Sequence, residues 1–401
     1  MNRVELVSGF FRHLAQTSSS PMAMVVSEAT GSIIRDAEGR DHIDLLAGMG
    51  VAATGHRHPK VVARIEEQLG RHLHVMVYGE MIQETQVALA QGLASLLPAT
   101  LDSVYFTNSG TEAVEGALKL ARKARGRNRL MAFHGAFHGD TLGAVSVGGN
   151  PHYRDPFEPL LPDVGFLAMD DRDGLAAIDD SVAAVIVEPV QAEAGVIIPS
   201  PGFLAALRER CSETGSLLIF DEVITGLGRT GTMFAFEREQ VVPDLLVLAK
   251  ALGGGLPLGA FIASRDLMAS LCQDPELGHV TTFGGHPLSA AAGLAALEVI
   301  IEEQLAERAE TAGAHFEERL TALLSGPCLE TVRRRGLLLG LVMDSAARTQ
   351  AFVKQCRAER LVLGWTLHDD RVLRLAPPLV ITEAELEESA LRMQRALARV
   401  S

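Results

Sequence analysis

Short apolar runs alternate with amphipathic helical patterns between about residue 100 and residue 300. Apolar runs this continuous are typical of strands that are buried on both faces of a sheet. Strands separated by helices are in turn typical of a layered α/β fold with a mainly parallel central sheet, which is the fold class that the pattern predicts. We expect strands at 103–108, 129–133, 181–190, 216–223 and 243–250, and helices at 111–124 and 202–214.

The two ends of the chain show a different pattern. The first 60 residues predict a helix and then two strand-like pieces that turn at the sequence EGRD. A long helical pattern runs from Pro287 to about Leu324, and Thr382 and Glu385 have capping-box spacing at the start of the last helix. Between them lie a strand-like run at 337–344, a helix at 349–360 and a hairpin-like segment at 361–377. We therefore expect a large domain at 61–300, a smaller α+β domain at 301–401, and an N-terminal segment, 1–60, that joins the smaller domain.

Length and charge narrow the function classes. The chain has 401 residues, of which 47% are hydrophobic, and this is enough for two cores. Its net charge of −14, from 50 acidic and 36 basic residues, argues against a nucleic-acid or anionic-membrane surface. It has no long apolar run, no signal-peptide pattern at its N-terminus, and four widely spaced cysteines without a CxxC pair. We expect a cytoplasmic protein that binds neither nucleic acid nor membranes.

Two histidine pairs raise the question of a metal site. His56 and His58 lie in GHRHP, and His134 and His138 lie in FHGAFHG. The second pair has a spacing that would place two ligands on one face of a helix, but a glycine follows each histidine and argues against a helix. We expect no metal site.

Ionisable residues follow three of the apolar strands. Glu188 comes after AAVIV, Asp221 after LLIF, and Lys250 after LLVLA in the stretch PDLLVLAKALGGG. A buried ammonium is costly unless it is paired or neutral, although a lysine at a strand end can also reach solvent over its own methylenes. Because the carboxyl ends of parallel strands share one edge of a sheet, where ligands bind, we expect these three side chains to converge.

A fourth strand, SVYFTN, ends at the same edge and leads into a helix through Ser109, Gly110 and Thr111. Two hydroxyls, a glycine and a helix N-terminus suit a phosphate group, although the same residues also make an ordinary helix cap. A phosphate site, a carboxylate and a strand-end lysine are together what pyridoxal phosphate needs. The lysine forms a Schiff base with its aldehyde, and the carboxylate keeps its pyridine nitrogen protonated.

Six segments, in order along the chain, resemble the class III pyridoxal-phosphate aminotransferases, the ornithine, acetylornithine, putrescine and 4-aminobutyrate group. They are TNSGTEAVEGALKLAR, FHGAFHGDTLGA, VEPVQAEAGVIIP, LLIFDEVITGLGRTGTMFAFE, PDLLVLAKALGGGLPLGA and TTFGGHPLSAAAG. The resemblance extends from about residue 20 to the end. It implies pyridoxal 5'-phosphate as cofactor, a fold-type-I transferase, and a homodimer with shared active sites that uses an amine donor and a 2-oxo acid acceptor.

The resemblance also assigns roles around the cofactor. It implies that Lys250 is the Schiff-base lysine and that Asp221 is the partner of the pyridine nitrogen. It also implies that Phe137 stacks on one face of the ring and that Val223 lies on the other. The further cofactor-binding residues that it implies are Ser109, Gly110 and Thr111 at the phosphate, His138 and Glu188 beside the ring, and Thr282 from the other subunit.

At the substrate, the resemblance makes Arg374 the carboxylate-binding residue and Glu193 its partner when a substrate presents no carboxylate there. A planar guanidinium fork suits a carboxylate, although a surface arginine on a strand is the structural alternative. The chain departs from the family at three positions. Asp140 stands where many 2-oxoglutarate users have a basic residue, Ile224 where ornithine-type members have glutamine, and Ala192 where glycine is usual.

These observations favour an aminotransferase that moves the ω-amino group of a diamine or ω-amino acid to 2-oxoglutarate or pyruvate. Arg374 and Glu193 favour plain transamination, because that pair serves two unlike substrates in one site. The alternatives are an aminomutase or a decarboxylating transaminase of the same fold, and a binding protein without activity. The intact Lys250 and Asp221 argue against the binding protein.

Overall fold

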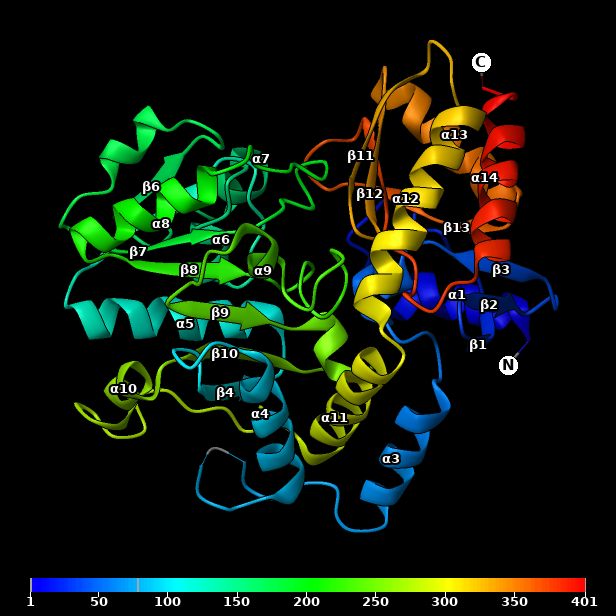
Figure 1. Ribbon diagram of the computed structural model, residues 1–401. Coiled ribbons are helices and arrows are strands. Elements are labelled where there is room, and N and C mark those ends of the chain that lie inside the picture. The colour runs from blue at the N-terminus through cyan, green and yellow to red at the C-terminus, as the bar shows by residue number, and fades with distance from the viewer. Residues whose placement is uncertain (1, 78, 401) are drawn as a thin grey trace.

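The central sheet of the computed structural model, which describes residues 2–77 and 79–400, has seven strands in the order β4-β10-β9-β8-β7-β5-β6 (Figure 1). Strand β10 is antiparallel to its neighbours β4 and β9, and the other pairs are parallel. The predicted mainly parallel α/β sheet is confirmed, and β6 and β10 are additions to it. The strands are β4 (Ser103–Thr107), β5 (Arg129–Phe133), β6 (Val164–Leu167), β7 (Val182–Val187), β8 (Leu217–Asp221), β9 (Leu245–Leu248) and β10 (Gly259–Ala263).

The inner strands are buried on both faces, as their continuous apolar runs predict. Every residue of β7, β8 and β9 is buried. On β8, Leu217 and Ile219 belong to one core cluster with the buried face of α5 (Gly110–Arg125), while Leu218 and Phe220 belong to another with α8 (Phe203–Thr214). Alternate side chains of a strand point to opposite faces, so a helix layer on each side is needed to bury both.

The long helical pattern after Pro287 is two helices, so the prediction of one helix is wrong. Helix α11 (Pro287–Glu302) is followed by α12 (Leu305–Leu323), and between them Gln304 takes a left-handed conformation with φ 51°. The break lets α11 pack on α3 (Pro59–Leu69) and α4 (Glu84–Leu96), whereas α12 packs on β11 (Leu329–Arg335) and α14 (Glu383–Leu397).

A second sheet, with the strand order β11-β12-β15-β14, lies in the C-terminal part and is antiparallel throughout. The predicted capping box is confirmed, because the Glu385 N–H donates to Thr382 Oγ1 at 3.2 Å and the Thr382 N–H donates to Glu385 Oε2 at 2.7 Å. The elements of this part are β11 (Leu329–Arg335), β12 (Leu338–Met343), β14 (Gly364–Trp365), β15 (Val372–Leu375), α13 (Ala346–Ala358) and α14 (Glu383–Leu397).

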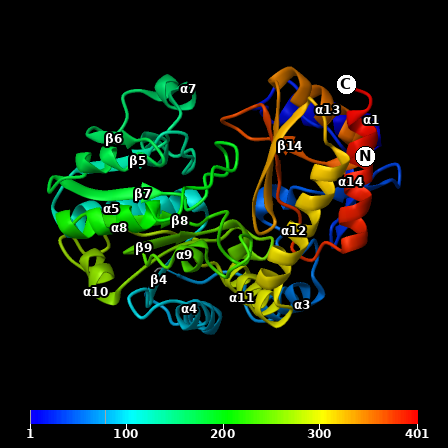
Figure 2. The same ribbon diagram turned by 45° about the horizontal axis from the view of Figure 1, so that its top comes forward.

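The third sheet joins the two ends of the chain. Its order is β1-β2-β3-β13, and β13 (Leu361–Val362) is parallel to β3. The N-terminal part has three strands where two were predicted, because Gly31, with φ 59°, turns the chain between the first two. Figure 2 shows these terminal elements in one lobe and the central sheet in the other, while the predicted boundaries 1–60, 61–300 and 301–401 stay a prediction. The elements are α1 (Arg3–His13), β1 (Val26–Thr30), β2 (Ile33–Asp36) and β3 (Asp41–Asp44).

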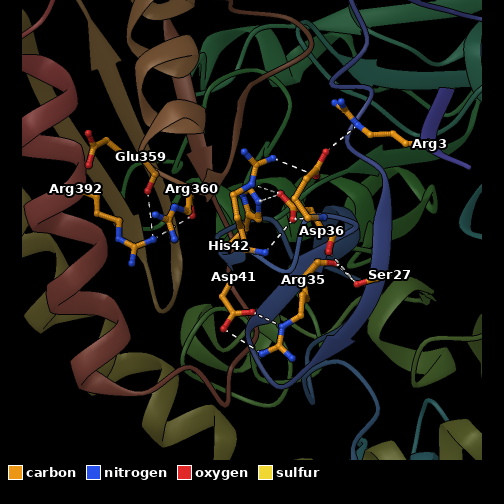
Figure 3. A network of polar contacts seen from close by, with 11 residues as sticks. Arg3, Ser27, Arg35, Asp36, Asp41, His42, Glu359, Arg360 and Arg392 are labelled. Carbon is orange, nitrogen blue, oxygen red and sulfur yellow. Dashed lines mark hydrogen bonds and ion pairs between the residues drawn. The ribbon is translucent and has the colours of Figure 1, made fainter.

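A polar network holds the turn between β2 and β3 (Figure 3). The buried Asp36 carboxylate binds Arg40 Nε at 2.7 Å and His42 Nε2 at 2.9 Å, and Arg35 Nε donates to Asp41 at 2.7 Å. Burial raises the pKa of Asp36, but the hydrogen bonds from His42 and Arg40 outweigh it and hold the pKa well below its usual range. The network therefore fixes the turn that leads into β3.

Shorter elements connect the larger ones. They are α2 (Ala47–Gly50), α6 (Leu142–Ser146), α7 (Pro151–Arg154), α9 (Ala235–Glu239), α10 (Arg265–Met268), and the 3₁₀ turns η1 (Asp155–Phe157), η2 (Asp173–Ala177), η3 (Lys250–Gly253) and η4 (Ala269–Cys272). Two of them begin two residues after a strand of the central sheet, η3 after β9 and α10 after β10.

Candidate active site

A cavity of about 500 Å³ lies at the carboxyl ends of the central strands. Ligands of open α/β sheets bind at this edge, where side chains from several strands meet. The structure thus brings together residues that are far apart in the sequence. The predicted site residues that line the cavity are Ser109, Gly110, Thr111, Phe137, His138, Asp140, Glu188, Glu193, Asp221, Val223 and Lys250.

One corner of the cavity is the N-terminus of α5. Ser109 is the helix cap, and its hydroxyl accepts from the Glu112 N–H at 3.3 Å, so the expected cap is present. Thr111 Oγ1 lies 2.7 Å from Thr141 Oγ1. A Cβ on Gly110 would lie 3.0 Å from the Val223 side chain, so a larger residue there would need Val223 to shift. Free N–H groups, hydroxyls and a close backbone suit an anion such as a phosphate.

Asp221, the last residue of β8, lies against a buried histidine. Asp221 Oδ2 is 2.7 Å from His138 Nδ1, and Asp221 Oδ1 accepts from the Val223 N–H at 3.0 Å. Burial lowers the pKa of His138, but its hydrogen bond with Asp221 and the negative charges of Asp221 and Glu188 outweigh burial, so the pKa is raised. The contact with His138 therefore fixes the position of the Asp221 carboxylate at the end of β8.

Glu188 follows β7 and binds backbone rather than another side chain. Its two carboxylate oxygens accept from the Phe137 N–H at 3.0 Å and the Ala192 N–H at 3.2 Å. Burial, to which the nearby Asp221 charge adds, raises the pKa of Glu188 to about 7, although His138 opposes the shift. Glu188 therefore holds the segment that presents Phe137 to the cavity.

Lys250 comes two residues after β9 and has a left-handed backbone with φ 48°. Non-glycine residues rarely adopt this conformation, and such strain is concentrated at functional sites. Burial and the Arg374 charge lower the pKa of Lys250, against the opposing effect of Glu193 and Asp221. A lowered pKa increases the fraction of neutral amine, which is the nucleophilic form.

Arg374 lies behind Glu193 as seen from the cavity. The arginine is only 1% exposed and does not line the cavity, whereas Glu193 does. Arg374 Nη1 donates to Glu193 Oε1, and Nη2 lies 3.4 Å from Met49 Sδ. Burial raises the pKa of Glu193, but the charge and hydrogen bond of Arg374 and the Leu367 N–H outweigh it and lower the pKa. The pair is therefore ionised, and Glu193 separates the arginine from the cavity.

Two of the predicted site residues, Thr282 and Asp140, are exposed to solvent. Thr282 is exposed and lies outside the cavity lining of its own chain. Its neighbour Thr281 accepts a hydrogen bond at 3.1 Å from the Asn108 side chain, which does line the cavity. Asp140 lines the cavity and is exposed at its rim.

The sequence reasoning did not include Asn108, Met49 and Val51. Asn108 follows β4 directly, so the rule that polar residues at strand ends meet at one edge could have found it. Val51 lines the cavity and Met49 contacts Arg374, but both belong to a segment where Met49 has φ 66°. No periodic pattern marks such a segment.

The remaining predictions concern groups away from the cavity. Among residues 2–77 and 79–400, no three His, Cys, Asp or Glu side chains gather as a metal site would require. His56 instead binds Asp44 at 2.8 Å, and His58 binds Glu303 at 3.1 Å. Within the same ranges, no helix has both the length and the apolar character needed to cross a membrane.

Comparison with known proteins places this site in a family. The model of the class III aminotransferases matches residues 14–397. The acetylornithine aminotransferase of Methanopyrus kandleri is 44% identical over 398 residues, which are 99% of each chain. That of Methanosarcina mazei is 42% identical over 368 residues, 91% of this chain and 89% of its own.

Solved structures give the same result. The ornithine aminotransferase of Toxoplasma gondii superposes with a TM-score of 0.92 at 32% identity, and the match covers 100% of this chain and 96% of that one. An (S)-enantioselective omega-transaminase from Thermomicrobium roseum superposes with a TM-score of 0.91 at 28% identity over 100% of this chain and 99% of its own. The fold therefore extends over the whole of this chain.

Proposed function

Because the chain belongs to the class III aminotransferases, a family of pyridoxal-phosphate-dependent enzymes of fold type I, we propose that it transfers the ω-amino group of a diamine or ω-amino acid to a 2-oxo acid. The observation that carries the proposal is the buried ion pair between Glu193 and Arg374 beside the cavity that Lys250 lines. The relatives named as acetylornithine and ornithine aminotransferases support the ω-amino position.

The residues of the cavity fit pyridoxal phosphate. The N-terminus of α5, with Ser109 and Thr111, would hold the phosphate, and Phe137 and Val223 would enclose the ring from its two faces. Asp221, held in place by its contact with His138, would hold a proton on the pyridine nitrogen. When bound, the cofactor supplies an electron sink for the carbon that carries the amine.

Lys250 is the proposed attachment point and the proposed proton carrier. Its lowered pKa makes the neutral amine available for the covalent bond to the cofactor. After exchange with a substrate amine, the freed Lys250 amine would be able to take a proton from the substrate carbon and return it one position away. No other lysine lines the cavity among the described residues.

Glu193 and Arg374 allow one site to accept two kinds of substrate. With the ion pair closed, the surroundings of the reacting carbon carry little net charge and accept a CH2–NH2 group. When a 2-oxo acid binds, its carboxylate displaces Glu193 and takes the guanidinium in its place. Glu193 has another partner for this purpose, because its Oε2 already accepts from the Leu367 N–H at 2.9 Å.

The acceptor and the assembly are further parts of the proposal. The Asp140 carboxylate at the rim disfavours a second acceptor carboxylate, so we expect pyruvate to compete with 2-oxoglutarate. We also propose a homodimer in which Thr282 contacts the phosphate in the site of the neighbouring subunit. Its exposed position outside its own cavity supports this role.

A matrix of amines and 2-oxo acids tests the proposed function. N-acetylornithine, ornithine, putrescine and 4-aminobutyrate are each incubated with 2-oxoglutarate or pyruvate, and the amino acid formed is quantified. At least one pair is expected to yield glutamate or alanine with the wild type and none with Lys250→Ala. Conversion of the amine substrate into an isomer, without consumption of the oxo acid, would indicate a mutase. Release of carbon dioxide would indicate a decarboxylating enzyme.

A further inference from the structure

The loop between β14 and β15 binds both the side chain and the backbone of Glu193. The Leu367 N–H donates to Glu193 Oε2 at 2.9 Å, and the His368 N–H donates to the Glu193 backbone carbonyl at 2.9 Å. The same hairpin carries Arg374, which binds Glu193 Oε1. One structural unit therefore supplies both partners of the Glu193 carboxylate.

Tyr153, in α7, holds this loop from the opposite side. Its hydroxyl donates to the Leu367 carbonyl at 2.9 Å, and its ring stacks on the His368 ring with centroids 5.2 Å apart. In both Figure 1 and Figure 2 the orange loop before β15 extends from the C-terminal lobe toward α7. His368 Nδ1 adds a hydrogen bond of 2.8 Å to the Gly135 carbonyl.

The Tyr153 hydroxyl and Glu193 are connected through a single peptide group. The Leu367 carbonyl accepts from Tyr153, and the His368 N–H of the same peptide group donates to the Glu193 backbone carbonyl. A hydrogen bond accepted at a carbonyl polarises its peptide and strengthens the attached N–H as a donor. The tyrosine thus strengthens the hold of the loop on the Glu193 backbone, while the donor to the Glu193 carboxylate, the Leu367 N–H, belongs to the preceding peptide group of the same loop.

The position of the loop matters most when a substrate carboxylate displaces Glu193 from Arg374. At that moment its buried carboxylate loses its charged partner, and leaving it without donors would be costly. The Leu367 N–H is the donor that remains, provided that the loop stays in place. A loop that drifts away makes the displaced state of Glu193 less favourable and so weakens the binding of an incoming carboxylate.

We propose that Tyr153 is a positioning residue that holds the loop with Leu367 and His368 against Glu193, keeps the Leu367 N–H at the Glu193 carboxylate, and thereby favours substrates whose carboxylate takes Arg374. The inference rests on the proposed function, because it assumes that Glu193 and a substrate carboxylate exchange at Arg374. Amines without a carboxylate at that position leave the ion pair closed and are less sensitive to Tyr153.

Tyr153→Phe tests the proposal, because it removes the hydroxyl and keeps the stacked ring. Tyr153 is 40% exposed, so the variant is expected to fold. The two half-reactions are measured separately from the absorbance of the bound cofactor, one with putrescine and the other with pyruvate or 2-oxoglutarate. We expect the apparent Kd of the oxo acid to rise about fivefold with little change in its limiting rate, and that of putrescine to change less than about twofold.

Tyr105→Phe is the matched control, because the Tyr105 hydroxyl also donates to a backbone carbonyl, that of His279, at 2.9 Å. It should leave the ratio of the two half-reactions unchanged. In a Glu193→Gln background the effect of Tyr153→Phe on the oxo acid should disappear, because there is no ion pair left to exchange.

Two results would overturn the role of Tyr153. One is an equal loss in both half-reactions, and the other is an effect on the oxo acid that persists in Glu193→Gln. A wild type that reacts with a 2-oxo acid but with none of the ω-amines would instead contradict the proposed function. The oxo-acid measurements would still decide the role of Tyr153 in that case.

Discussion

The backbone at Lys250 lies in the left-handed region two residues after β9, and the side chain lines the cavity together with Asp221 and Glu193. Strained residues of this kind cost on the order of 1–3 kcal/mol and persist only where the surrounding structure fixes them. Here three glycines follow within η3 and the next residues, which gives the chain room to turn away from the sheet. The strain therefore coincides with the proposed attachment point of the cofactor.

Asp221→Asn should keep the fold and lose activity by several orders of magnitude. A neutral amide cannot hold a proton on a pyridine nitrogen, and it also removes the negative charge that pairs with His138. The measurement is the single-turnover rate with a saturating amine, beside far-UV circular dichroism. Asp244→Asn, which removes a carboxylate bound to the Leu218 N–H outside the cavity, should change stability without this loss. A variant that kept more than about a tenth of the wild-type rate would contradict the assignment.

Asp140→Arg should shift the acceptor preference toward 2-oxoglutarate. Asp140 lines the cavity at its exposed rim, where a carboxylate repels the far carboxylate of a dicarboxylic acceptor by on the order of 1 kcal/mol. An arginine there would attract it instead. The ratio of kcat/KM for 2-oxoglutarate to that for pyruvate is compared between the wild type and the variant. An unchanged ratio, with a wild type that already prefers 2-oxoglutarate strongly, would show that Asp140 does not face the acceptor.

The free energy of unfolding should decrease as pH rises, because of a second buried carboxyl group, that of Glu222. Its oxygens accept from the Ala235 N–H at 2.6 Å and the Phe236 N–H at 2.9 Å, and burial raises its pKa from 4.5 to about 7. Between these two values the folded state binds more protons than the unfolded state, so the free energy of unfolding decreases as pH rises. Relative to Glu222→Gln, the wild type should lose about 3 kcal/mol between pH 4.5 and pH 7. Urea unfolding at pH 5 and pH 8 measures this, and equal losses in both proteins would contradict it.

At the level of single residues, the sequence predicted the side chains that follow strands, because that position depends only on the apolar run before them. It did not predict what those side chains bind. Glu188 binds backbone N–H groups and Asp221 binds His138, and both contacts depend on how the 134–140 loop crosses the sheet edge. Met49 was missed for a similar reason, since its left-handed segment reaches Arg374 from far away in the sequence.

Among the elements, strands with long apolar runs were predicted, whereas strands defined by their partners were not. Strand β13 has two residues and exists because β3 pairs with it. For helices α11 and α12, the sequence pattern does not show where one helix ends and the next begins. Their apolar pattern is nearly continuous, and the break at Gln304 follows from what each helix packs against rather than from a helix-breaking residue.

Substitutions at Gln304 should reverse the usual order of helix propensity. In a helix interior alanine is more favourable than glycine by about 1 kcal/mol, but in the left-handed region glycine is favoured by a similar amount. Because Gln304 has φ 51°, we expect Gln304→Gly to be more stable than Gln304→Ala by about 1 kcal/mol. At Glu318, an exposed position within α12, alanine should be the more stable of the two. The free energy of unfolding in urea decides, and the same order at both positions would contradict the break.

For the whole molecule, two segments carry apolar side chains that the single chain leaves exposed. The segments meet at one point, where the centroid of the His74 ring lies 4.9 Å from that of the Phe283 ring. The exposed apolar residues of the two segments are Leu73, Met76, Met81, Ile82, Leu277, Val280 and Phe283. Exposed apolar side chains on adjoining segments are typical of an interaction surface, here called the exposed face, and Thr282 belongs to one of the two segments. The proposed homodimer would use this face if Thr282 serves the neighbouring site.

Mixed dimers should therefore recover activity that neither parent has. If Thr282 serves the neighbouring site, a dimer of one Lys250→Ala and one Thr282→Ala subunit has one site with both defects and one site with neither. We expect activity to return when the two variants are mixed and allowed to exchange subunits at limiting pyridoxal phosphate. Thr281→Ala is the matched control, because Thr281 binds Asn108 of its own chain, so mixing it with Lys250→Ala leaves no intact site. Recovery is measured as kcat per intact site after the hybrid has been separated by charge tags. A verified hybrid without recovered activity would mean that Thr282 acts within its own subunit, and the exposed face would then need another role.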